Sequence, residues 1–171
     1  MTTSRYASNL LGALALTVAD RIDETLTDRL QAGSSASAGL LSIGTRPGGS
    51  VRELATVLQM SHSAAVRLVD RLVARNLVTR SRGGADGRVV SLTLTAAGGR
   101  IFKRLLDDRN RVLRSATDTL TDREHAQFEK LLLKMLRSIP SDRQDALHVC
   151  RLCEHAVCRG DACPVGSAVQ A

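Results

Sequence analysis

Apolar residues recur with helical spacing near both ends of the chain. Between residues 5 and 32, leucine, valine and isoleucine return about every fourth position, which predicts one long amphipathic helix. A second helix is predicted at about 96–118. A third follows Thr121 and ends before Pro140, and its apolar positions fall at i, i+3, i+4, i+7 and i+8. Stripes of this kind must pack against other helices, either within one chain or between two.

The middle of the chain predicts shorter helices. One is expected at about 37–44, before a Pro-Gly-Gly turn. Ser50 and Glu53 have the spacing of a capping box, which starts a helix that reaches about Leu58. Ser61 is expected to cap the next helix, which ends near Arg75 before an asparagine.

Two β-type runs, at 77–80 and 89–94, flank a glycine-rich polar segment and predict a β-hairpin. Two short capped helices followed by a hairpin have the order of a winged helix-turn-helix. In that motif the second helix enters the major groove, and the hairpin reaches the backbone or the minor groove. The expected fold is mainly α with a small β-hairpin wing, in three parts: a helical region at 5–34 and 96–139, a winged lobe at 35–95, and a tail at 140–171.

The charge of the chain favours a nucleic-acid partner. The formal net charge is +7 over 171 residues, and six arginines against two aspartates between residues 61 and 88 contribute +4 of it. A charge stripe is often only a solvated helix face, but here it is followed by a basic hairpin. The N-terminal turn of the second helix is expected to meet base edges, and the arginines to bind phosphates. The expected DNA-binding residues are Ser61, His62, Ser63, Ala64, Arg67, Arg71, Arg75, Arg80 and Arg82.

Other classes of function find little support in the sequence. Aromatic residues make up only 2% of the chain, which argues against platforms that stack single-stranded or RNA bases. No apolar run approaches the roughly 20 residues of a membrane helix, and no secretory signal is visible. No arrangement of nucleophile, base or paired carboxylates stands out. We therefore expect a cytoplasmic protein that is not an enzyme and does not bind membranes.

Several segments of the sequence resemble the MarR family of transcriptional regulators. The match extends over about residues 8–139. It is specific, because several motifs stand in the order and spacing of that family. The motifs are Ser-Val-Arg-Glu-Leu-Ala at 50–55, the capped arginine-rich helix at 61–72, Asn-Leu-Val-Thr-Arg at 76–80, Asp-Gly-Arg at 86–88 and Leu-Thr-Leu-Thr-Ala-Ala-Gly at 92–98.

The resemblance implies a homodimer on double-stranded DNA with a pseudo-palindromic operator. The helices at 5–34 and 96–139 would then form the dimerisation region. By position, Arg88 matches the wing arginine that enters the minor groove, Asp86 the residue that holds the wing, and Asp70 the acid that pairs with a wing arginine. The sequence departs from the family at Gly87, where an arginine is common. Many such proteins also respond to a small-molecule effector, an aromatic anion in the cleft beside the dimer helices.

All four cysteines lie in the last 22 residues of the chain, at Cys150, Cys153, Cys158 and Cys163. A disulfide scaffold would spread its cysteines through the fold, so clustering at one end indicates a metal site or a thiol switch. Four thiolates suit tetrahedral zinc, and the spacing is that of a zinc knuckle with cysteine in place of histidine. An iron–sulfur cluster is the alternative cofactor. His155 lies inside the loop and could replace one thiol.

These observations predict a dimeric repressor whose DNA affinity responds to the metal or redox state of the cysteine loop, or to a small ligand. The hypothesis is that the state of the tail changes its packing on the dimer helices and so the spacing of the two lobes. The alternative is a thiol-redox protein or an adaptor whose zinc tail recruits another protein.

Overall fold

The computed structural model describes residues 4–82, 90–158 and 163–169, which form eight helices and a two-stranded antiparallel hairpin. The mainly helical fold with a small β-hairpin is the one that the sequence predicts. The elements are α1 (Arg5–Leu30), α2 (Ser34–Thr45), α3 (Val51–Val57), α4 (His62–Ala74), β1 (Val78–Arg82), β2 (Val90–Leu94), α5 (Ala96–Ser115), α6 (Asp122–Leu136), α7 (Arg143–Val149) and α8 (Pro164–Ala168).

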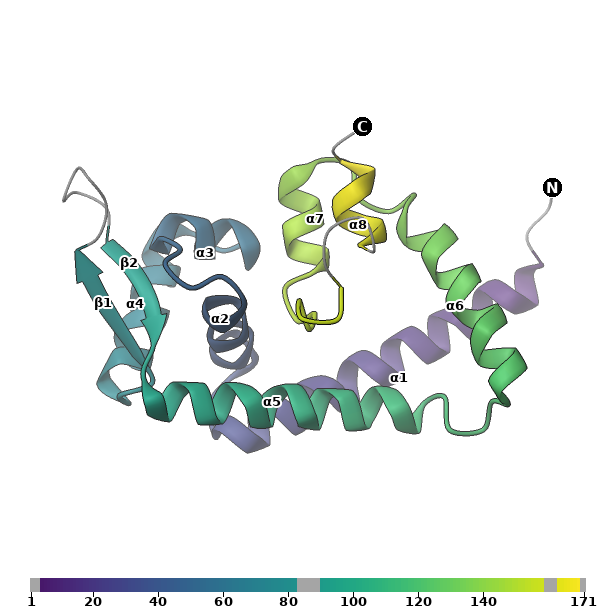
Figure 1. Cartoon of the computed structure of the whole chain (residues 1–171), viewed down its shortest axis with the longest axis horizontal. Helices are drawn as coiled ribbons and strands as arrows, with labels where there is room; N and C mark the ends of the chain where they lie inside the picture. The colour runs from purple at the N-terminus through teal and green to yellow at the C-terminus, as the bar shows by residue number, and fades with distance from the viewer. Residues whose placement is uncertain (1–3, 83–89, 159–162, 170–171) are drawn as a thin grey trace.

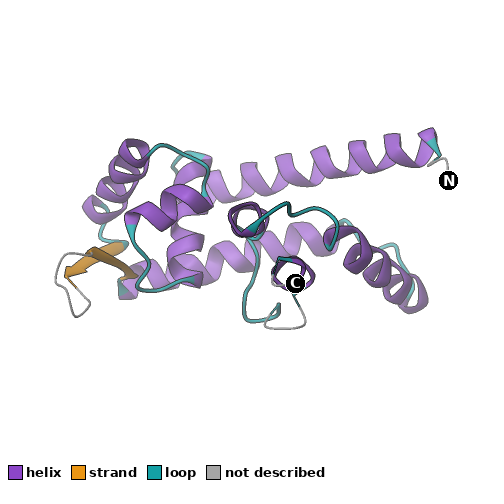
Figure 2. Ribbon diagram, turned by 90° about the horizontal axis from the view of Figure 1, so that it is seen from above, coloured by secondary structure: helices purple, strands orange, loops and turns teal. Residues whose placement is uncertain are grey.

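Two long helices, α1 and α5, connect the two ends of the molecule. They pack against each other where the C-terminal part of α1 meets α5, while α2, α3, α4 and the hairpin gather at one end (Figure 1). Helix α6 lies at the other end, and α7 and α8 lie between it and α3. The N-terminal half of α1 projects away from the rest (Figure 2). No helix within the described ranges is long and apolar enough to cross a membrane.

Side-chain caps fix most of the helix starts that the sequence predicts. Ser50 and Glu53 form a complete capping box at α3, and Thr121 forms another at α6. The Ser61 hydroxyl accepts a hydrogen bond from the Ala64 amide at the start of α4. Helix α2 is longer than expected because it begins at Ser34, directly after α1.

The core lies where α1, α2, α4, α5 and the hairpin meet. Leu40 and Leu41 of α2 are fully buried, and so is Leu105 of α5. Helix α4 turns one apolar face into this core, and the buried residues of that face are Ala65, Leu68, Val69 and Leu72. This packing turns the opposite face of α4, which carries Arg67 and Arg71, towards solvent.

A buried carboxylate on the inner side of α5 ties this helix to α1, and its partner on α1 could not be predicted from the sequence. Asp108 of α5 is only 2% exposed and accepts hydrogen bonds from Arg29 of α1 and from Arg111 one turn further along α5. The hydrogen bonds from Arg29, more than its charge, hold the pKa of Asp108 below its usual value, against the opposing effect of burial. The ion pair fixes the two long helices relative to each other.

The tail packs against α5, as the hypothesis of packing on the long helices expects, and also against the winged lobe, which the sequence did not predict. Nδ1 of His148 in α7 lies 2.9 Å from the carbonyl oxygen of Val57 at the end of α3. The Asn110 amide of α5 donates to Glu154 over 2.6 Å, and Leu152 packs against the core. The two short tail helices were not predicted, because seven and five residues are too few to show a helical period.

Candidate functional site

Helix α4 presents a polar surface at its N-terminal turn. Ser61, His62, Ser63 and Arg67 are exposed, and Ala64 is half-buried. Arg71 is exposed one turn beyond Arg67, on the same side of the helix. The structure therefore groups these predicted DNA-binding residues on one accessible face, and their role in binding stays a prediction.

Two of the predicted arginines have partners within the protein. Arg75 donates to the carbonyl oxygen of Leu30 over 2.8 Å, so its guanidinium braces α4 against the end of α1. Arg80 of β1 lies 2.7 Å from Asp70 of α4. That ion pair is the one that the family resemblance implies between the helix and the wing, and it orients the hairpin relative to α4.

The tip of the wing is not covered by the structure. Asp86, Gly87 and Arg88 lie outside the described residues, and for Arg82 only the backbone at the end of β1 is described. The two strands that lead to the tip are paired from Val78 with Leu94 to Arg82 with Val90. The predicted roles of Arg82, Asp86 and Arg88 stay predictions.

The four cysteines lie around one cavity of about 340 Å³ between the tail and the end of α2. They come from the end of α7, the following loop and the N-cap of α8, where the Cys163 sulfur accepts a hydrogen bond from the Gly166 amide over 3.2 Å. His155, Arg46 and Arg143 also line the cavity. In the part of the chain that the structure describes, no three histidine, cysteine or acidic side chains are already arranged to hold a metal ion.

The thiols interact closely enough to change one another's acidity. A hydrogen bond from Cys150 lowers the pKa of Cys153 to about 6, helped by the positive charges of Arg109, Arg46 and Arg151, while burial opposes the shift. The same hydrogen bond, together with burial, raises the pKa of Cys150. Burial, and then contact with Cys163, raise the pKa of Cys158 to about 11. Of these three thiols, Cys153 is thus the most acidic.

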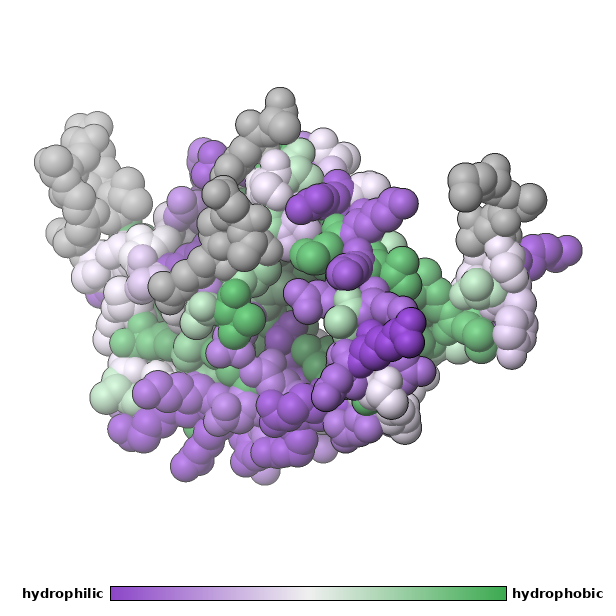
Figure 3. All heavy atoms as spheres, turned by 45° about the vertical axis from the view of Figure 1, so that its right-hand side comes forward, coloured by the Kyte–Doolittle hydropathy of each residue, from purple (hydrophilic) through white to green (hydrophobic). Residues whose placement is uncertain are grey.

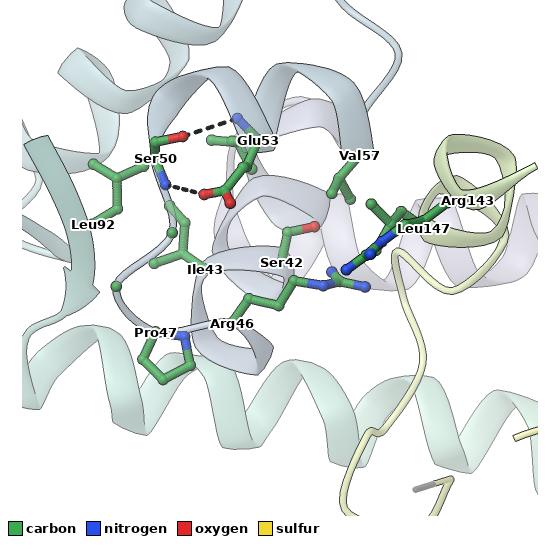
Figure 4. Close-up of a pocket in the computed structure, with 13 residues that line it drawn as sticks. Ser42, Ile43, Arg46, Pro47, Ser50, Glu53, Val57, Leu92, Arg143 and Leu147 are labelled. Carbon is green, nitrogen blue, oxygen red and sulfur yellow. Dashed lines mark hydrogen bonds between the residues drawn. The ribbon is translucent and has the colours of Figure 1, made fainter. Parts of the chain in front are cut away.

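A second cavity, of about 410 Å³, lies between the end of α2, α3 and α7. Arg46 and Arg143 line its tail side, and Ser42 also lines it (Figure 4). Glu53 lies on the opposite side, bound to the backbone of Ser50. Sequence reasoning missed this site because its residues belong to two distant segments and follow no motif.

A large, mostly apolar cavity of about 960 Å³ opens between α1, α2, the end of α5 and α6. Leucines of the projecting part of α1 are between 45% and 68% exposed, and no residue of α6 is buried. Figure 3 shows this apolar surface extending along the arm that leads to the N-terminus. The exposed apolar residues in α1 are Leu10, Leu11, Leu14 and Leu16, and those in α6 are Leu131, Leu132 and Met135.

Comparison with known proteins identifies relatives of the winged lobe. The MarR family profile matches residues 38–89. The uncharacterised HTH-type transcriptional regulator YsmB of Bacillus subtilis is 35% identical over 85 residues, which are 50% of this chain and 58% of that protein. The matched segments span about three fifths of the first curated relatives that they match.

Solved structures extend the likeness to the long helices. The apo form of MarR from Escherichia coli is 30% identical with a TM-score of 0.58, over 74% of this chain and 96% of that one. A MarR family protein from Bacillus stearothermophilus is 26% identical with a TM-score of 0.68, over 79% of this chain and 96% of that one. In both comparisons about a quarter or a fifth of this chain has no counterpart.

Proposed function

This chain belongs to the MarR family of transcriptional regulators, and we propose that it is a dimeric repressor that binds a pseudo-palindromic site on double-stranded DNA. The observation that carries the proposal is the exposed face of α4, held by a buried apolar face and by the ion pair of Asp70 with Arg80. A capped helix with exposed polar side chains at its N-terminal turn is suited to enter a major groove.

The residues of this face divide into two roles. His62, Ser63 and Arg67 lie where a recognition helix meets base edges, so we assign them to sequence readout together with Ser61 and Ala64. Arg71, with the hairpin arginines Arg80, Arg82 and Arg88, is assigned to phosphate contacts and to the minor groove. Arg75 is assigned to bracing, because its guanidinium already binds the Leu30 carbonyl.

A second copy of the chain is the proposed cover for the apolar surface of α1 and α6. Leucines that are half exposed on two neighbouring amphipathic helices cost free energy in water, and burying them between two copies recovers it. Such a dimer would place two α4 helices on one DNA duplex. The apolar cavity beside these helices is then the proposed place for a small-molecule effector.

Selection of DNA from a randomised duplex library tests the proposed function. A symmetric dimer is expected to enrich inverted repeats whose half-sites are about one helical turn apart. Recovery of DNA without an enriched motif would contradict sequence-specific binding, and enrichment of a single half-site would contradict the dimer. Oligomeric state is read in parallel by analytical ultracentrifugation.

We also propose that the four cysteines hold one zinc ion per chain. The thiols line a single cavity, the Gly166 amide donates to the Cys163 sulfur, and Arg46, Arg109 and Arg151 offset the negative charge of bound thiolates. Zinc would supply a fixed cross-link that draws the four thiols together. Because the tail packs on α3, closing this cross-link would hold the tail against the DNA-binding lobe.

The double substitution Cys150→Ser and Cys153→Ser is expected to remove the metal and to change DNA affinity about tenfold, through the contact of α7 with α3. Elemental analysis and an absorbance spectrum of protein purified without oxygen measure the metal, and anisotropy titration measures DNA affinity. The matched control is Val157→Ser in the same loop, where the side chain is 76% exposed. If the analysis finds iron and sulfide, the tail holds an iron–sulfur cluster in place of zinc. Unchanged DNA affinity in every metal and redox state would rule out regulation by the tail.

A further inference from the structure

The cavity between α2, α3 and α7 brings two cationic side chains together. Arg46 ends α2 and Arg143 begins α7, and both line this one cavity although the two residues are almost a hundred positions apart in sequence (Figure 4). Two like charges in one cavity repel, and an anion between or beside them relieves that repulsion. The geometry therefore calls for a negatively charged group on this side of the cavity.

Two polar atoms at this place lack a partner. Nη1 of Arg46 and the hydroxyl oxygen of Ser42 are both buried, and neither has a hydrogen-bond partner among the described residues. Ser42 as a whole is only 3% exposed. Burying a guanidinium N–H and a hydroxyl without partners is costly, and folded proteins rarely tolerate it unless a bound molecule completes the site.

The protein supplies little negative charge of its own here. Glu53 is the acidic residue that lines the cavity, and its Oε2 accepts a hydrogen bond from the Ser50 amide over 2.6 Å as part of the α3 capping box. The ion pairs found in the described part of the chain involve neither Arg46 nor Arg143. The carboxylate that is present serves the helix start, and although its charge and those of Cys150 and Cys153 act on Arg46, no ion pair among the described residues neutralises either guanidinium group.

Besides the loop at 47–50, the remaining walls of the cavity are aliphatic. They are formed by Ile43, Leu54, Val57, Leu92 and Leu147, and the volume of about 410 Å³ is in the range of small-molecule sites. A guanidinium pair with a hydroxyl matches the planar, bidentate geometry of a carboxylate, and the aliphatic walls match a short hydrocarbon body. We propose that this cavity is a binding site for a small aliphatic carboxylate, held by Arg46, Arg143 and Ser42.

The cysteine cavity is the competing explanation for the two arginines, since Arg46 and Arg143 line it as well. Ser42 and the aliphatic walls of α3 and β2 line only the cavity beside α3. Thiolates in the cysteine cavity would therefore leave the Ser42 hydroxyl without a hydrogen-bond partner. A ligand in this cavity would bridge α2 and α3 of the winged lobe to α7 of the tail, and its effect on DNA affinity rests on the proposed function.

Isothermal titration calorimetry of the full chain with hexanoate tests the site without DNA. Hexanamide, which has the same shape and no charge, is the ligand control. We expect hexanoate to bind with a dissociation constant of about 1 mM or tighter, and hexanamide at least tenfold more weakly. Arg46→Gln and Arg143→Gln are each expected to weaken hexanoate binding at least tenfold. Arg52→Gln, an exposed residue of α3 that does not line the cavity, is expected to leave it unchanged.

Three results would overturn the proposal. Equal binding of hexanoate and hexanamide would show that charge plays no part, and tighter binding of inorganic phosphate would replace the carboxylate by another anion. If the unsubstituted chain binds no hexanoate and Arg46→Gln loses its metal, the arginines belong to the cysteine cavity. Because Arg143 is exposed, its variant is expected to fold even if Arg46→Gln does not, and circular dichroism checks both. If the chain binds hexanoate but shows no sequence-specific DNA binding, the carboxylate site is confirmed and the proposed function is refuted.

Discussion

Reversing the charges of Arg67 and Arg71 together is expected to weaken binding to the selected DNA site at least about 100-fold. Both side chains are exposed on the face of α4 that its buried apolar residues turn outwards. The substitution Arg67→Glu with Arg71→Glu removes two attractive contacts per subunit and adds repulsion of the phosphates. The slope of log affinity against log salt is also expected to fall by about 2 per subunit.

Lys130→Glu with Lys134→Glu is the matched control, because it changes the net charge equally on exposed positions of α6, far from the hairpin (Figure 1). Fluorescence anisotropy at several salt concentrations measures both variants, and ultracentrifugation checks that the oligomeric state is unchanged. Equal weakening by the two pairs would show that only net charge matters, and α4 would lose its role as the recognition helix.

Gly98→Ala is expected to destabilise the fold by about 3 kcal/mol or more, enough to unfold much of the winged lobe. A Cβ atom at Gly98 would lie 1.9 Å from the carbonyl oxygen of Leu77, which belongs to the backbone between α4 and β1 and cannot rotate away. The same carbonyl accepts a hydrogen bond from Thr95, the N-cap of α5. The start of α5 would have to move away from the hairpin.

The neighbouring Gly99 supplies the control for this prediction. A Cβ atom there meets nothing within 4 Å, so Gly99→Ala is expected to stabilise α5 by up to about 1 kcal/mol through helix propensity alone. Urea unfolding followed by circular dichroism measures both variants. If Gly98→Ala were as stable as Gly99→Ala, the close packing of α5 on Leu77 would be wrong.

Local signals were sufficient to predict the elements of the lobe. Capping residues such as Ser50 and Ser61 act within one helical turn, and the apolar period of α4 extends over its whole length, so both can be seen in the sequence. The family resemblance added the pair of Asp70 with Arg80, which joins residues ten positions apart. The motifs of the resemblance also include Gly98, and the structure explains this glycine by its close approach to the Leu77 carbonyl.

Contacts between distant segments could not be predicted from the sequence in the same way. Asp108 lies in register with Ile101, Leu105 and Val112 on the inner side of α5, and only the approach of Arg29 from α1 explains a charged residue there. Arg75 follows Arg71 with the spacing of one charge stripe, yet its long side chain turns to the Leu30 carbonyl. The cavity at Ser42 and Arg46 exists because the tail folds back onto α3, and nothing in the tail pattern indicates that direction.

Relative affinity for specific and unspecific DNA tests the central claim most directly. The selected inverted repeat and a scrambled duplex of the same length and composition carry equal charge, so a difference between them reports sequence recognition. At physiological salt the dimer is expected to bind the selected duplex about 1,000-fold more tightly, with two chains per duplex. Equal affinity for the two duplexes would mean that the basic surface binds DNA only by charge, and it would contradict a sequence-specific regulator.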